Sequence, residues 1–75
     1  MWKLDEEGNA YSEDGRYLDV VGAYIVVESS FAYDSKKSLI KWTHTDIAPF
    51  DTEEEAFDYI RDIVAKRNAD ENKRH

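Results

Sequence analysis

The chain has 75 residues, and its 17 acidic and 10 basic side chains give it a net charge of −7. This length suits a single domain, and the absence of cysteine excludes disulfides and thiolate metal sites. The core must therefore be built from apolar side chains, among which are two Trp, three Phe and five Tyr. The negative charge argues against direct binding of nucleic acid or of an anionic membrane. No apolar run is long enough to span a bilayer and no signal-peptide pattern is present, so we expect a soluble, cytoplasmic protein without a cofactor.

The first twenty residues contain a short internal repetition. Residues 4–10 are followed directly by residues 11–17, and in each copy an apolar residue precedes an acidic turn that ends in glycine. Gly8 and Gly15 can supply the positive φ angles that such turns require. We therefore expect short extended segments at 2–4, 9–12 and 16–20, connected as a meander.

The middle of the chain predicts a β-hairpin with strands at 22–31 and 38–45. The run from Tyr24 to Val27 is aromatic and β-branched, and it is too short for a buried helix. In the second strand Ile40 and Trp42 alternate with polar residues, which is typical of a strand with one apolar face. A polar loop separates the two segments.

The C-terminal third predicts one helix over about 52–68. Thr52 and Glu55 have the spacing of a capping box, and three glutamates follow Thr52 at the positive end of the helix dipole. One apolar stripe follows at helical spacing: Ala56, Phe57, Ile60, Ile63 and Val64. Residues 69–75 have nothing to bury and are expected to form a flexible tail.

These segments predict a single α+β domain over 1–68, in which one C-terminal helix packs on a small antiparallel sheet of three to four strands. We expect the helix to cover the sheet face that carries Ile25, Val27, Ile40 and Trp42. Tyr24 and Val26 would then point to the opposite face, which one helix cannot also cover. That face could be covered by the N-terminal segment, by a second copy of the chain, or by a partner protein.

Acidic residues are concentrated in two runs, 5–14 and 51–58. Carboxylates spaced on a rigid frame could imitate a row of phosphates and bind a basic protein that normally holds nucleic acid. Alternatively, they could be solvated residues of turns and of the helix start. The candidate partner-binding residues are Asp5, Glu6, Glu7, Glu13, Asp14, Tyr24, Tyr33, Glu53, Glu54 and Asp58.

No motif points to catalysis, to a metal ion or to a cofactor. His44 lies two residues before Asp46, but nothing in the sequence supplies a nucleophile or a substrate pocket. The segment that begins at Asp5 lacks the ligand spacing of an EF-hand loop. Aromatic side chains such as Trp42 could stack on bases, but the only basic cluster (Lys36, Lys37 and Lys41) lies in a negative field.

In size, sign of charge and compactness the chain is similar to the small acidic proteins that phages use to block host defence or transcription, anti-CRISPR proteins among them. We therefore expect a non-enzymatic protein-interaction module. Its partner would be a larger basic protein or a nucleic-acid-binding complex, and nucleic-acid mimicry is one way in which the chain would inhibit it. Two alternatives remain: a domain that self-associates through a sheet face or edge, so that the chain is a monomer or a homodimer, and a small enzyme.

Overall fold

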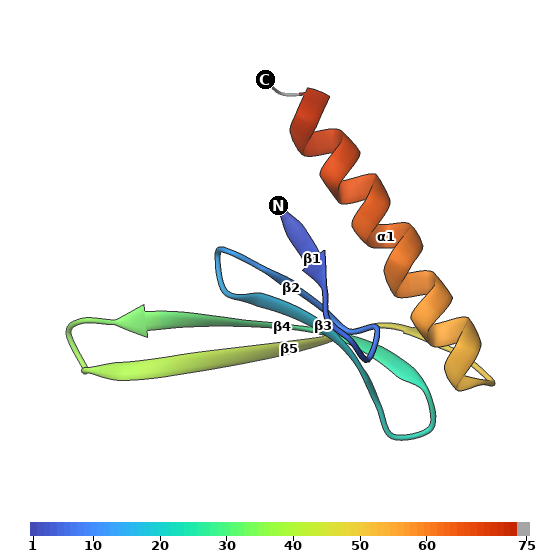
Figure 1. The fold of residues 1–75 in the computed structure, drawn as a ribbon. Coiled ribbons are helices and arrows are strands. Elements are labelled where there is room, and N and C mark those ends of the chain that lie inside the picture. Colours follow the sequence, from blue (N-terminus) through green and yellow to red (C-terminus); the bar gives the residue numbers. More distant parts are fainter. Residues whose placement is uncertain (74–75) are drawn as a thin grey trace.

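The computed structural model describes residues 1–73 and shows five antiparallel strands followed by one helix (Figure 1). Neighbouring strands pair in the order β1-β2-β3-β4-β5, so the sheet is a simple meander. The elements are β1 (Trp2–Leu4), β2 (Ala10–Ser12), β3 (Arg16–Val21), β4 (Ile25–Asp34), β5 (Leu39–Pro49) and α1 (Glu53–Lys73). The predicted α+β fold is confirmed, with five strands instead of three or four.

The two acidic turns of the N-terminal repetition connect β1 to β2 and β2 to β3. In the first turn, Oδ1 of Asp5 accepts hydrogen bonds from the backbone N–H groups of Glu7, Gly8 and Asn9 at 3.0, 3.0 and 2.9 Å. Gly8 and Gly15 have φ angles of +102° and +87°, as their place in the turns predicts. The repetition therefore builds two consecutive hairpins, which extend the sheet and do not cover it.

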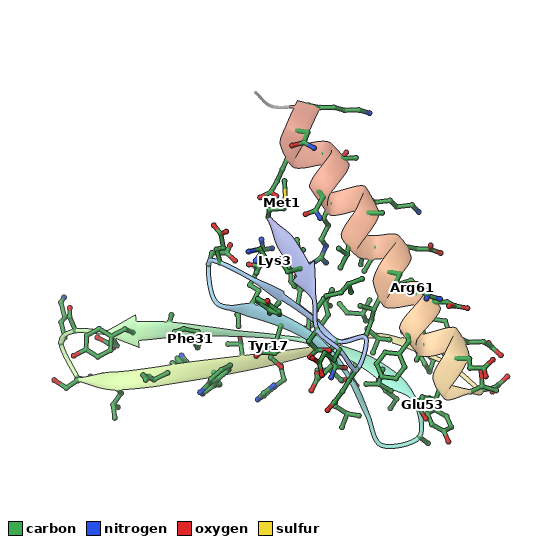
Figure 2. All side chains as sticks on the ribbon, viewed as in Figure 1. Met1, Lys3, Tyr17, Phe31, Glu53 and Arg61 are labelled. Atoms are coloured by element: carbon green, nitrogen blue, oxygen red, sulfur yellow. The ribbon has the colours of Figure 1, made fainter. Side chains whose placement is uncertain are left out.

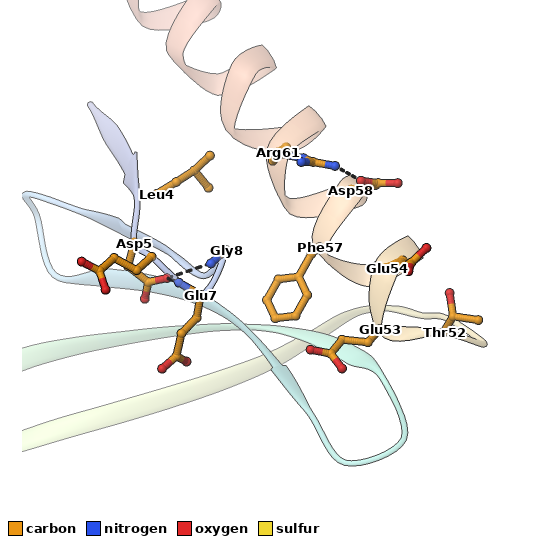
Figure 3. Close-up of a pocket in the computed structure, with 11 residues that line it drawn as sticks. Leu4, Asp5, Glu7, Gly8, Thr52, Glu53, Glu54, Phe57, Asp58 and Arg61 are labelled. Atoms are coloured by element: carbon orange, nitrogen blue, oxygen red, sulfur yellow. Dashed lines mark hydrogen bonds and ion pairs between the residues drawn. The ribbon is translucent and has the colours of Figure 1, made fainter.

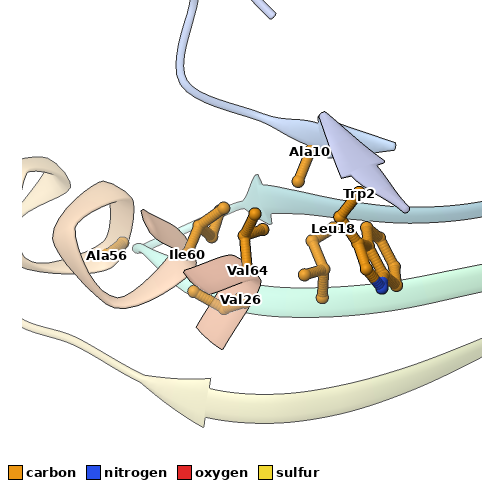
Figure 4. Packing of buried hydrophobic residues seen from close by; sticks show 7 residues of the cluster. All are labelled: Trp2, Ala10, Leu18, Val26, Ala56, Ile60 and Val64. Carbon is orange, nitrogen blue, oxygen red and sulfur yellow. The ribbon is translucent and has the colours of Figure 1, made fainter. Parts of the chain in front are cut away.

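The core lies between α1 and one face of strands β1 to β4 (Figure 4). Its largest fully buried side chains are Leu18 on β3, Val26 on β4 and Ile60 on α1. Burial of each such side chain contributes about 1.5–3 kcal/mol. The complete cluster consists of Trp2, Ala10, Leu18, Val26, Ala56, Ile60 and Val64.

The expected orientation of the central strand was wrong. Val26 is fully buried beneath the helix, so Ile25 and Val27 point to the opposite face. Because Val26 pairs with Val20 and Glu28 pairs with Leu18, the register with β3 sets this orientation. When the side chains on both faces of a strand are apolar, the sequence does not reveal which of the two alternating sets faces the helix.

Helix α1 begins as predicted and continues to Lys73, five residues beyond the expected end. At its start, the N–H of Glu55 donates to Oγ1 of Thr52 at 3.2 Å. Near its end, Asn68 bonds both the N–H and the C=O of Trp2, at 2.9 and 3.1 Å. This tether to β1 explains why the polar segment after residue 68 stays helical. Residues 74 and 75 of the expected tail lie outside the described residues, and no helix in residues 1–73 is sufficiently long and apolar to cross a bilayer.

An ionic cluster closes the end of the core around Trp2. The guanidinium groups of Arg16 and Arg67 lie 4.9 and 5.0 Å from the centre of the Trp2 ring. The two terminal nitrogens of the Arg67 guanidinium, Nη1 and Nη2, donate to the Glu28 carboxylate, at 3.0 and 2.8 Å. Glu28 and Arg67 are 20% and 28% exposed, so this bidentate pair is shielded more than a surface ion pair.

The outer half of the β4–β5 hairpin projects beyond the rest of the sheet (Figures 1 and 2). Strand β3 accompanies β4 only as far as Ser30, which pairs with Arg16. Residues 31–43, called the arm below, therefore form a two-stranded ribbon that α1 does not cover. This placement corrects the expectation that Ile40 and Trp42 pack under the helix, since they are 60% and 51% exposed.

Candidate functional site: an acidic groove

An open groove of about 1040 Å³ separates the β1–β2 turn from the first turns of α1 (Figure 3). It brings together segments that are almost fifty residues apart in the sequence. The residues that line it are Leu4, Asp5, Glu6, Glu7, Gly8, Thr52, Glu53, Glu54, Phe57, Asp58 and Arg61. The groove therefore joins the beginning of the first predicted acidic run, 5–14, to residues from both ends of the second run, 51–58.

The contact between Gly8 and Phe57 connects the two walls of the groove. A Cβ atom on Gly8 would lie 2.8 Å from Cδ1 and 3.3 Å from Cγ of the Phe57 ring. Glycine is thus required here for two reasons. The backbone has a positive φ angle, and the Phe57 ring occupies the space that a side chain at position 8 would need. On the same turn, Asp5 uses Oδ1 to hold three backbone N–H groups.

Carboxylates surround an apolar floor in this groove. Leu4 is 43% exposed and Phe57 is partly buried, so both present carbon to the open space. Six acidic side chains lie around them: Asp5, Glu6, Glu7, Glu53, Glu54 and Asp58. Among the described lining residues Arg61 is the one basic group, and it forms an ion pair with Asp58. The arrangement suits a ligand that combines positive charge with apolar surface.

Six of the ten residues predicted to bind a partner lie in this groove, and four lie elsewhere. Glu13 and Asp14 belong to the β2–β3 turn, where Asp14 bonds the hydroxyl of Ser12 and accepts from Nε of Arg16 at 3.1 Å. Tyr24 occupies the β3–β4 turn with φ +66°. Tyr33 is on the arm and is 64% exposed. The predicted residues thus form one cluster and three separate positions.

The sequence reasoning missed the apolar floor of the groove. Phe57 belongs to the apolar stripe of the helix, so its spacing predicts a core residue. It lies at the margin of that stripe, where Gly8 of the neighbouring turn packs against its ring. The pattern of a glycine after an acidic turn was visible in the sequence, but its partner ring was not.

His44 forms a polar contact that the sequence did not indicate. Its Nδ1 lies 2.7 Å from Oγ of Ser29, the residue with which it pairs across β4 and β5. Neither side chain lines the acidic groove. Within residues 1–73, no three His, Asp or Glu side chains are grouped so that they could hold a metal ion.

Comparison of the chain with protein-family models, with curated proteins and with solved structures finds no match.

Proposed function

We propose that this chain is a non-enzymatic protein-binding module that captures a basic, partly apolar segment of a larger protein in the acidic groove. The observation that carries the proposal is the convergence of two acidic runs, distant in sequence, around the exposed carbon of Leu4 and Phe57. If these acidic residues served only as solvated residues of turns and of the helix start, there would be no reason for them to converge around a shared apolar floor.

Charge and shape have separate roles in this proposal. The carboxylates attract and orient a cationic segment, and this attraction weakens as salt shortens the Debye length from about 10 Å at 0.1 M to about 3 Å at 1 M. The floor provides contact with apolar side chains, which salt does not screen. A partner that uses the same basic segment to hold nucleic acid would be inhibited when the groove occupies that segment.

The test compares two triple variants with the same net charge. The groove variant carries Glu6→Gln, Glu7→Gln and Glu53→Gln, and the control variant carries Glu13→Gln, Asp62→Asn and Asp70→Asn. All six side chains are exposed, and each variant changes the net charge from −7 to −4. None of the six caps the helix, and within the β1–β2 turn Glu7 accepts only one long hydrogen bond, from Nδ2 of Asn9 at 3.5 Å, which glutamine can also accept.

The probe is a synthetic amphipathic peptide of Leu and Lys, with a second peptide in which Ser replaces Leu. We expect the groove variant to bind the first peptide about tenfold more weakly than the control variant does. This factor corresponds to a loss of about 1.4 kcal/mol in binding free energy, shared among three exposed ion pairs. The Ser peptide should bind more weakly than the Leu peptide to the unmodified chain. Equal affinity of the two triple variants would mean that only net charge matters and would remove the groove from the account.

A further inference from the structure

The sheet face opposite α1 carries a continuous patch of exposed aromatic and aliphatic side chains. Cross-strand pairing places Tyr11 beside Tyr17, Phe31 beside Trp42 and Tyr33 beside Ile40. All six side chains are between 39% and 64% exposed. They point away from the helix because alternate residues of β4, such as Val26, point toward it. We call these six side chains the arm face, which includes Tyr11 on β2 and Tyr17 on β3 beside the base of the arm.

The arm itself has little internal support. Beyond Ser30 it is a two-stranded ribbon, and an isolated hairpin of this kind is only marginally stable in water. Among its stabilising contacts are the Phe31 and Trp42 rings, whose centres are 5.1 Å apart, and the packing of the Phe31 ring against Gly15. The hydroxyl groups of Ser30 and Thr43 are also 2.8 Å apart at its base. A surface that covered the arm face would stabilise the arm.

Charge along this side of the sheet changes sign from the tip to the base. The arm holds three lysines against one acid, a net charge of +2, so the rest of the chain carries −9. Its tip turn holds Lys36 and Lys37, whereas Lys41, which pairs with Ala32, points to the other face of the ribbon. At the base of the same face, Asp19 and Asp46 flank Val27 on the neighbouring strands. Oδ1 of Asp19 is buried there and has no hydrogen-bond partner among residues 1–73.

A face that is basic at one end, apolar in the middle and acidic at the other end is complementary to an inverted copy of itself. Lys36 is five residues beyond Phe31 toward the tip, and Asp46 is four residues beyond Trp42 toward the base. At about 3.3 Å per residue, both lie roughly 13–17 Å from the Phe31–Trp42 pair. A two-fold axis near that pair would therefore bring the lysines of each copy to the aspartates of the other.

The exposed area is adequate for such a contact. Large aromatic side chains have about 150–250 Å² each, so six side chains that are roughly half exposed offer about 500–600 Å². A standard interface buries about 800 Å² on each partner, and backbone and neighbouring side chains would supply the remainder.

We propose that the occupant of the arm face is a second copy of this chain, packed face to face and antiparallel around a two-fold axis near Phe31 and Trp42. Each copy then places Lys36 and Lys37 against Asp46 and Asp19 of the other. The acidic groove is on the helix side of the molecule and stays free, so this proposal does not depend on the proposed function.

The test begins with sedimentation equilibrium of the full chain over a range of concentrations. We expect a monomer–dimer equilibrium at low salt. A variant with Tyr33→Ser and Ile40→Ser should keep the fold by circular dichroism, because these side chains are 64% and 60% exposed and the Phe31–Trp42 contact stays in place. It should dimerise at least about tenfold more weakly. A wild-type chain that is monomeric at every concentration would overturn the proposal, as would a dimer that these substitutions leave intact.

A charge exchange tests the antiparallel arrangement. The tip variant carries Lys36→Glu and Lys37→Glu, and the base variant carries Asp46→Lys. The tip variant should form a weaker homodimer because like charges meet at both ends. The base variant should form a weaker homodimer because its base, with the lysine introduced at position 46 beside Asp19, no longer attracts the two lysines of the tip. Mixed in equal amounts the two should form a heterodimer tighter than either homodimer, because one end keeps the wild-type pairing and the glutamates at the other end meet the new lysine. No recovery on mixing would overturn the arrangement. A monomer whose tryptophan fluorescence responds to single-stranded DNA in the unmodified chain, but not after Trp42→Phe, would overturn the proposal and make nucleic acid the occupant of the arm face.

Discussion

Replacement of Gly8 by alanine tests the contact that joins the two walls of the groove. A methyl group there would lie 2.8 Å from Cδ1 of Phe57, and the backbone would keep a φ of +102°. The positive φ costs about 1–2 kcal/mol for a residue with a Cβ atom. Moving the Phe57 ring from its preferred rotamer adds about 0.5–1.5 kcal/mol.

Gly22 offers a matched control within the same chain. Its φ is +63°, and a Cβ atom there would meet nothing within 4 Å. Gly22→Ala therefore carries the backbone cost but no steric cost. In both variants alanine also lowers the entropy of the unfolded chain, by about 0.4–1 kcal/mol, and this contribution cancels in the comparison.

We expect Gly8→Ala to lower the free energy of unfolding by about 1.5–2.5 kcal/mol and Gly22→Ala by about 1 kcal/mol. For a domain of this size, 1 kcal/mol corresponds to a change in Tm of roughly 4–8 °C. Urea denaturation followed by circular dichroism measures both variants directly. Equal losses in the two variants would show that the Phe57 ring does not press on the turn, and the described wall of the groove would then be incorrect.

Two further substitutions test the ends of α1. Thr52→Ala removes the acceptor for the N–H of Glu55 and should cost about 1 kcal/mol in urea denaturation, and a loss close to zero would mean that the cap contributes nothing. Arg67→Met leaves Glu28 without its bidentate partner and uncovers the Trp2 ring, so we expect a loss of about 1–3 kcal/mol, with Lys66→Met on the exposed face as the control. Similar losses for Arg67→Met and Lys66→Met would contradict a structural role for the cluster around Trp2.

The elements with local signals could be predicted from the sequence. A helix cap or a positive φ angle depends on only a few neighbouring residues. The helix start could therefore be predicted from Thr52 and Glu55, and the two N-terminal turns from Gly8 and Gly15. The helix continues beyond residue 68 for a different reason. Asn68 holds the backbone of Trp2, which is 66 residues away, and no local pattern indicates such a contact.

The orientation of β4 and the arm depended on long-range register. Because the residues from Ile25 to Val27 are all apolar, the pairing of Val26 with Val20 had to be known before their faces could be assigned. The extent of the arm depended on where β3 ends. The carboxylates of the candidate site could be recognised in the sequence as two acidic runs. Their convergence could not be predicted, because it depends on the contact of Gly8 with Phe57.

The most direct test of the groove maps where a basic ligand binds. The amphipathic Leu and Lys peptide is added to the isotope-labelled chain, and the amide signals are followed by NMR. We predict that the largest shifts fall on residues 4–8 and 53–61 and diminish at high salt. Shifts spread evenly over the acidic residues, or concentrated on the β2–β3 turn at Glu13 and Asp14, would contradict a groove that binds its partner as a defined site.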